Sequence, residues 1–182
     1  SKLNSMVKSV DDNLGNYRIP EATKALAEFV DDMSNWYVRR CRERYWAKDM
    51  PQDKINAYMT LYTALVTLCK AAAPMIPFLT EDIYQNLVRT VDKNAPESIH
   101  LCDFPEVNES MIDPELEASM DEVLKVVVFG RAARNTANIK SRQPIANMYI
   151  KAAKTLDDYF VDILRDELNV KNVEFKLSLI HI

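Results

Sequence analysis

Glycine is nearly absent from this sequence: Gly15 and Gly130 are the only two in 182 residues. Tight hairpins and phosphate-binding loops both depend on glycine, because they need positive φ angles or a close approach of the backbone. The scarcity therefore argues against a β-rich fold. It also excludes every nucleotide-binding motif that is defined by glycine spacing.

Cysteine is scarce as well. Cys41, Cys69 and Cys102 lie far apart and are odd in number, which predicts a reducing compartment and offers no metal-ligand spacing. The sequence has no apolar run of membrane-spanning length and no secretory signal. We therefore expect a cytoplasmic protein with no membrane partner and no metal site. No Ser-His-Asp set, Cys-His set or paired carboxylate motif occurs at usable spacing, so we expect no catalytic residues.

Apolar residues, by contrast, are plentiful at 48% of the chain, and most of them recur at helical spacing. The pattern predicts helices over residues 3–14, 20–46 and 51–73, and a fourth helix that ends near residue 91. A surface loop is expected over residues 92–112. Asp113, Pro114 and Glu115 then form the N-cap, first-position proline and first-turn acid of a fifth helix.

After Pro144 the apolar period changes from helical spacing to two. We expect Thr155 to cap a short acidic helix between two strands. The strands are marked by alternating apolar residues, Met148 and Ile150 in the first and Val173, Phe175, Leu177 and Leu179 in the second. The fold class we predict is mainly α: an antiparallel helical bundle over residues 1–143, with a small β-α-β appendage over residues 144–182. The last residues read as the end of a piece cut from a longer protein.

The net charge of −4 is distributed unevenly along the chain. No acidic residue occurs between Glu122 and Asp157, and that interval carries +7. Residues 33–48 carry a net +4, so the remaining chain carries −15. An acidic protein with two segregated basic segments is built to bind an anion at one place.

The first basic segment combines four arginines and four aromatic residues between Trp36 and Trp46. Guanidinium groups bind phosphates, and aromatic faces stack on bases or on one another. The apolar stripe Leu26, Phe29, Val30, Met33 and Tyr37 continues on the same helix as Arg40 and Arg44. We expect Arg40, nearer the bundle, to pair with buried acids, and Arg44, one turn further out, to face RNA.

The fifth helix repeats this arrangement, because its apolar stripe continues as Gly130, Arg131, Arg134 and Asn138. Gly130 either packs against another element of the protein or admits a nucleic-acid backbone. Asn135 and Asn138 either hydrogen-bond to base edges or cap the end of the helix. Arginines that pair with acids inside a bundle are the alternative reading for both stripes.

Three strings resemble the anticodon-binding domain of class I aminoacyl-tRNA synthetases, and specifically the isoleucine enzymes. They are SNWYVRR over residues 34–40, APMIPFLTEDIY over residues 73–84 and GRAARN through NIKSRQP over residues 130–144. The resemblance extends over almost the whole chain. It implies a helical bundle that receives the tRNA anticodon stem-loop, followed by a smaller mixed domain.

The resemblance makes the chain part of an ATP-dependent isoleucine–tRNA ligase whose catalytic signatures are absent here. We therefore expect no cofactor in this chain, and we assign ATP and Mg²⁺ to the parent. The expected partners are the anticodon stem-loop of isoleucine tRNA and the catalytic domain of the parent chain. The RNA-binding residues we predict are Arg39, Arg42, Arg44, Trp46, Arg131, Arg134, Asn135, Asn138, Lys140 and Arg142. The alternative function is a helical module that docks onto an acidic protein through the same arginines.

Overall fold

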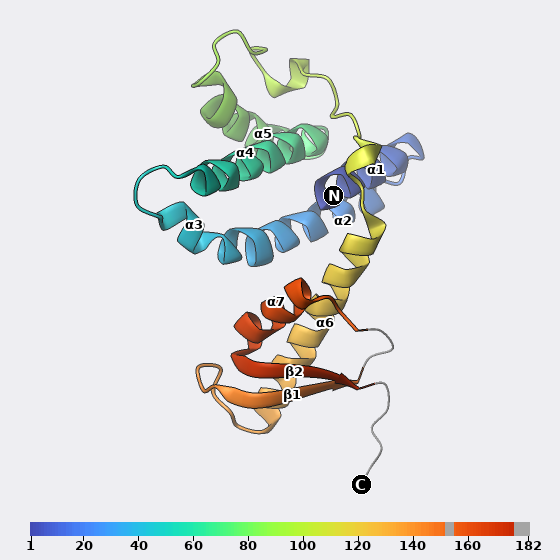
Figure 1. Ribbon diagram of the computed structural model, residues 1–182. Helices are drawn as coiled ribbons and strands as arrows, with labels where there is room; N and C mark the ends of the chain where they lie inside the picture. Colours follow the sequence, from blue (N-terminus) through green and yellow to red (C-terminus); the bar gives the residue numbers. More distant parts are fainter. Residues whose placement is uncertain (152–154, 177–182) are drawn as a thin grey trace. The chain divides into compact units, whose positions relative to one another are not determined.

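The computed structural model describes residues 1–151 and 155–176 (Figure 1). By internal contacts the chain divides into two units, Ser1–Ile112 and a second that begins at Asp113. The structure is mostly helical with one small parallel sheet, which confirms the predicted fold class. The contacts group the helix after Asp113 with the sheet, whereas the sequence analysis placed that helix in the bundle.

The first unit consists of helices followed by a long loop (Figure 1). In chain order its helical elements are α1 (Lys2–Gly15), α2 (Ile19–Asp32), the π-helical segment η1 (Met33–Val38), α3 (Arg42–Trp46), α4 (Gln52–Ala72), α5 (Pro77–Tyr84) and the π-helical segment η2 (Gln85–Arg89). Two 3₁₀ turns, η3 (Ile99–Leu101) and η4 (Glu109–Met111), lie within the predicted loop.

The core of the first unit lies where α1, α2 and α4 meet. Its buried residues include Met6, Val7 and Val10 of α1, Leu26 and Phe29 of α2, and Leu68, Ala71 and Ala72 of α4. The predicted stripe of α2 is thus confirmed at Leu26 and Phe29. Val30 is different, because 43% of its surface is exposed.

The long helix predicted over residues 20–46 is interrupted. It is α-helical to Asp32 and π-helical over η1, and it breaks at Cys41, whose φ of −81° and ψ of 3° are not helical. A π-helical turn takes more residues than an α-helical one, so it rotates all later side chains about the axis. The faces predicted for residues after Val38 therefore shift.

The loop after η2 is fastened to α5. Glu81 accepts hydrogen bonds from Ser98 Oγ at 2.8 Å and from the Ile99 amide at 2.9 Å, and the Tyr84 hydroxyl donates to the Pro96 carbonyl at 2.9 Å. Burial works to raise the pKa of Glu81, but the hydrogen bonds outweigh it and hold that pKa below its usual range. The carboxylate therefore remains charged and anchors the loop.

The second unit contains α6 (Pro114–Thr136), β1 (Ile145–Lys151), α7 (Asp158–Leu168) and β2 (Val170–Lys176). The two strands pair in parallel, with Ile145 opposite Val170 and Lys151 opposite Lys176 (Figure 1). This confirms the predicted β-α-β order. Leu177 and Leu179, which the prediction assigned to the second strand, lie outside the described residues.

The caps of the two long helices in this unit are set by aspartates. Asp113 caps α6 as predicted, since its Oδ1 accepts from the Leu116 amide at 2.9 Å. The prediction for α7 was wrong: Asp157, not Thr155, occupies the N-cap position. Leu116, the first residue of the predicted inward face of α6, is 47% exposed because only the later turns of α6 are buried.

Gly130 is a packing glycine. A Cβ atom at this position would lie 2.6 Å from Leu168 Cδ1, closer than carbon atoms can approach. Of the two readings that the sequence left open, the structure therefore supports close packing of α6 against the end of α7.

Arg134, one turn further along α6, is only 5% exposed. Its Nη2 donates to the carbonyls of Leu168 at 2.7 Å and Gln143 at 2.8 Å, and Nη1 donates to that of Lys140 at 3.2 Å. Leu168 ends α7, where the helix dipole concentrates partial negative charge, so the buried cation needs no carboxylate. The prediction that Arg134 binds RNA phosphates is not supported, because its donors are used inside the protein.

We expect Arg134→Met to destabilise the second unit by about 3–5 kcal/mol, because it removes the donors for several buried carbonyls. Arg142→Ala is the control, since Arg142 is exposed and a surface substitution should cost under about 0.5 kcal/mol. Amide hydrogen exchange of β1 and β2 measures the loss. The fluorescence of Trp36 and Trp46, which lie in the first unit, checks that the effect is local. Equal protection of the strands in both variants would contradict the structural role of Arg134.

Candidate nucleic-acid interface

Two arginine–tryptophan pairs occupy the segment between η1 and the end of α3. The Arg39 guanidinium carbon lies 5.3 Å from the centroid of Trp36, and that of Arg42 lies 5.6 Å from the centroid of Trp46. Both arginines are exposed, and Trp46 is 76% exposed. We call these four residues the Trp–Arg ladder. Each guanidinium is held over an aromatic face by a cation–π contact and is thereby pre-positioned for an anion.

The local structure explains how the ladder is presented. Cys41, between the two pairs, is buried and breaks the helix. After the break, the Tyr45 ring lies 5.0 Å from that of Tyr58, which docks α3 on α4. Burial raises the pKa of the Tyr45 hydroxyl. The apolar side of α3 is thus fixed to the bundle, and Arg42 and Trp46 remain exposed.

Arg44 forms a bidentate ion pair instead. Its Nε and Nη2 donate to the two carboxylate oxygens of Asp53, each at 2.7 Å. These hydrogen bonds lower the pKa of Asp53, which lies in the first turn of α4. Arg40, by contrast, is exposed. Neither arginine lies as expected: Arg40, predicted to be buried with acids, is exposed, and Arg44, predicted to face RNA, is held by Asp53.

The second basic segment, residues 131–142, is sorted by the structure into paired and exposed groups. Arg131 donates to Glu167 Oε2 at 2.8 Å, and the Glu167 side chain is only 3% exposed. The side chains of Asn135, Lys140 and Arg142 are exposed. Of the predicted residues in this segment, these three remain the best placed to meet a ligand.

Asn138 ends α6 with a left-handed backbone conformation, at φ 54°. The Asn138 amide donates to the Asn135 carbonyl at 3.1 Å, and the Ile139 amide donates to the Arg134 carbonyl at 2.9 Å. This pair of bonds is a Schellman motif. The structure therefore supports the reading of Asn138 as part of the end of the helix.

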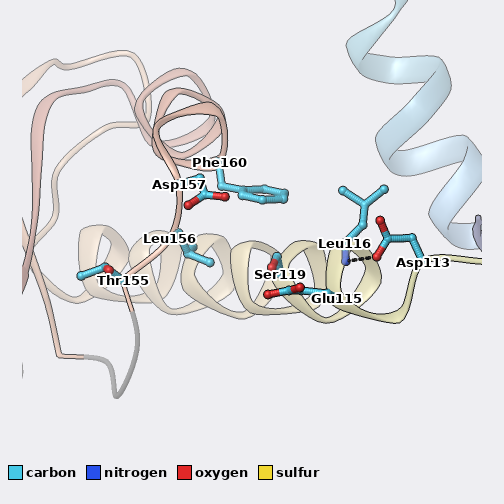
Figure 2. A pocket seen from close by; sticks show the side chains of 8 residues that line it. All are labelled: Asp113, Glu115, Leu116, Ser119, Thr155, Leu156, Asp157 and Phe160. Atoms are coloured by element: carbon cyan, nitrogen blue, oxygen red, sulfur yellow. Dashed lines mark hydrogen bonds between the residues drawn. The ribbon is translucent and has the colours of Figure 1, made fainter.

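One cavity of about 260 Å³ lies in the second unit between the first turns of α6 and the start of α7 (Figure 2). Three carboxylic acids, Asp113, Glu115 and Asp157, line it together with Leu116 and Phe160. Negative charge disfavours phosphate groups, so this cavity is no part of an RNA interface.

A second cavity, of about 250 Å³, lies beside the second basic segment and has mostly apolar walls. Nothing in the sequence marked it, because its lining comes from α6, β1 and the end of α7. Trp36, at the start of the first basic segment, is half-buried and paired with Arg39.

The described residues contain no group of three or more His, Cys, Asp or Glu side chains that could hold a metal ion. In the same part of the chain, no helix is long and apolar enough to cross a membrane.

Comparison with known proteins identifies the family. The sequence profile described as "Anticodon-binding domain of tRNA ligase" matches residues 1–152. An isoleucine–tRNA ligase of Clostridium novyi is 54% identical over 98% of this chain, and one of Chlamydia pneumoniae is 42% identical over 96%. The chain spans 17% of the length of each of these relatives. The resemblance to the isoleucine enzymes is thereby confirmed, and the chain belongs to the family of anticodon-binding domains of tRNA ligases.

Proposed function

We propose that this chain binds the anticodon stem-loop of isoleucine tRNA as part of an isoleucine–tRNA ligase. The observation that carries the proposal is the Trp–Arg ladder, in which an arginine is held over the half-buried ring of Trp36 and another over the exposed ring of Trp46. An anticodon loop exposes bases that are not paired and phosphates that flank them. Single-stranded RNA of this kind is recognised by stacking and by hydrogen bonds to base edges.

Within the ladder the two residue types have separate tasks. Trp46, with most of its ring exposed, stacks on a loop base, and the rings of all four bases suit this contact. Arg39 and Arg42 direct their N–H groups to the neighbouring phosphates, which fix the position of the RNA without reading its sequence.

The exposed residues of the second basic segment, which belongs to the other unit, supply separate contacts to the RNA. Lys140 and Arg142 contact the backbone of the stem, and the amide of Asn135 can both donate to and accept from a base edge. Arg131 contributes less, because its guanidinium is already paired with Glu167.

The reaction of the parent enzyme takes place outside this chain. The described residues offer neither a glycine-rich phosphate loop nor a metal-ligand group, so they do not fit ATP and Mg²⁺. We assign both to the catalytic domain of the parent, the second expected partner, in the cytoplasm. This chain supplies the contact that selects the tRNA.

A protein-docking module is the second candidate, and the same ladder supports it. Exposed tryptophans and arginines are the residues that dominate binding energy at protein interfaces. The two functions differ in their dependence on salt, since contacts to several phosphates release bound counterions and a protein interface does not.

We expect the affinity for an anticodon stem-loop to fall steeply with salt. Contacts from Arg39, Arg40, Arg42, Lys140 and Arg142 predict a slope of about −3.5 to −4.5 in a plot of log affinity against log salt. Arg42→Ala should reduce this slope by about 0.7–0.9. Trp46→Ala should weaken binding about tenfold and leave the slope unchanged, because it removes stacking and no charge. Lys24→Ala, on the acidic helix α2, is the control. If the affinity of the unsubstituted chain does not change with salt, protein docking is favoured instead.

The positions of Arg40 and Arg44 give a second prediction. Arg40→Ala should weaken stem-loop binding, by an amount that shrinks as salt rises, and leave the denaturant midpoint unchanged. Arg44→Ala and Asp53→Ala should lower the midpoint slightly and by similar amounts, because an exposed ion pair contributes little.

The pH dependence of this ion pair tests the same assignment. The folded-state pKa of Asp53 is lowered, so its contribution is complete above the unfolded value of about 3.9 and is lost as the pH falls through the folded value. Double-mutant cycles of Arg44 and Asp53 at pH 7 and at pH 2 measure it. If Arg44→Ala strongly weakens RNA binding and leaves the midpoint of denaturant unfolding unchanged, Arg44 faces RNA as the sequence analysis expected.

We also expect the isolated chain to show no isoleucine activation. Isoleucine-dependent exchange of pyrophosphate into ATP should stay at the level of a reaction without protein, because no residue set for that chemistry was found in the sequence. Exchange above that level, which persists after repurification, would show that the chain contains an active site.

A further inference from the structure

The apolar cavity of the second unit has the dimensions of a site for one small flat group. Its volume of about 250 Å³ lies below the range of roughly 300–1,000 Å³ that accommodates drug-sized ligands. Its apolar lining includes Ala137 at the end of α6, Met148 of β1 and Leu168 of α7. We call this cavity the α6–β1 pocket. Ala137 is exposed and so lies at its mouth.

Two polar side chains also line the α6–β1 pocket, Arg134 and Asn147. Arg134 is 5% exposed and its N–H groups donate to carbonyls of the protein, so it shapes the wall of the pocket and offers a ligand no donor. Asn147 Oδ1 accepts from Asn172 Nδ2 at 3.0 Å, which fixes the orientation of the amide and leaves its NH₂ group as the donor for a ligand. Apolar walls and a fixed amide suit an unstacked nucleobase, whose ring packs against side chains and whose edge takes hydrogen bonds.

Two cations on the loop next to the pocket favour an anionic ligand. The loop between α6 and β1 is held by its carbonyls, since Arg134 binds those of Lys140 and Gln143 and Asn169 Nδ2 donates to that of Ser141 at 3.4 Å. The exposed side chains of Lys140 and Arg142 lie on this fixed loop. An apolar side chain of a protein partner would gain nothing from these cations, whereas a base carries a phosphate on either side.

We propose that the α6–β1 pocket receives one unstacked nucleobase of a single-stranded RNA segment, with the adjacent phosphates at Lys140 and Arg142. The inference rests on the proposed function and adds a base-specific contact to it. The base lies against the apolar walls of the pocket, and the amide of Asn147 donates to an acceptor on its edge. Binding by charge and stacking on the Trp–Arg ladder does not depend on this pocket.

Filling the mouth of the pocket tests the proposal. Ala137→Leu adds three carbon atoms there and changes no charge, so it should weaken binding of the anticodon stem-loop about tenfold, the loss expected for one stacked base. Ala132→Leu is the matched control, because Ala132 is an exposed alanine on the same helix that does not line the pocket. Asn147→Asp, which replaces the NH₂ donor with an acceptor, should weaken binding similarly even if Ala137→Leu does not fold.

Fluorescence locates the base. A set of stem-loops carries 2-aminopurine at one loop position each. At one of these positions the emission of 2-aminopurine should change when the stem-loop binds the unsubstituted chain or Ala132→Leu, but not when it binds Ala137→Leu. Equal affinity and equal emission for all three proteins would overturn the pocket while leaving the proposed function intact. The unsubstituted chain could instead fail to bind the stem-loop but bind an unstructured RNA heptamer, for which Ala137→Leu has lost affinity. In that case the proposed function fails and the pocket stands.

Discussion

The second unit depends on one buried cation. A two-stranded parallel sheet is too small to be stable alone and needs helices packed against it. Arg134 makes this possible, because a single guanidinium joins α6 to the last carbonyls of α7 and to the loop that leads into β1. Gly130 lets Leu168 approach closely enough for these bonds to form. The same contacts shape the α6–β1 pocket, so the element that stabilises the unit also defines its candidate binding site.

Two helices show how far the sequence carries a structural prediction. Both stripes end in arginine, yet Arg134 is buried and Arg40 is exposed. In α6 the α-helical period is unbroken, so Arg134 stays on the face of the buried Val123, Val127 and Gly130. In the other helix the π-helical segment rotates later residues away from that face. No residue pattern announces a π-helical turn, so periodicity predicted the bundle and the β-α-β order but not these side chains.

The residues of the candidate site could likewise be predicted from the sequence only in part. Arg39, Arg42 and Trp46 were found from the sequence because a run of arginines and aromatic residues is visible within eleven residues. The partner of Arg44 was not, because Asp53 is one of several acids within reach along the chain and only the fold selects it. The pocket was invisible for a related reason: Ala137, Met148 and Leu168 are ordinary apolar residues until three elements bring them together.

The charge distribution favours discrimination over strong binding. Outside residues 33–48 and 123–156 the chain carries −15, so it repels RNA except where those two intervals meet the ligand. The protein can then make only a few phosphate contacts, which are the contacts whose affinity does not depend on the RNA sequence. In the proposed mode of binding, stacking on Trp46 and insertion of a base beside Asn147 would therefore make up a larger share of the binding free energy than on a uniformly basic surface. A domain that must select one tRNA among many gains from this balance, because the contacts that read bases are the ones that decide whether it binds.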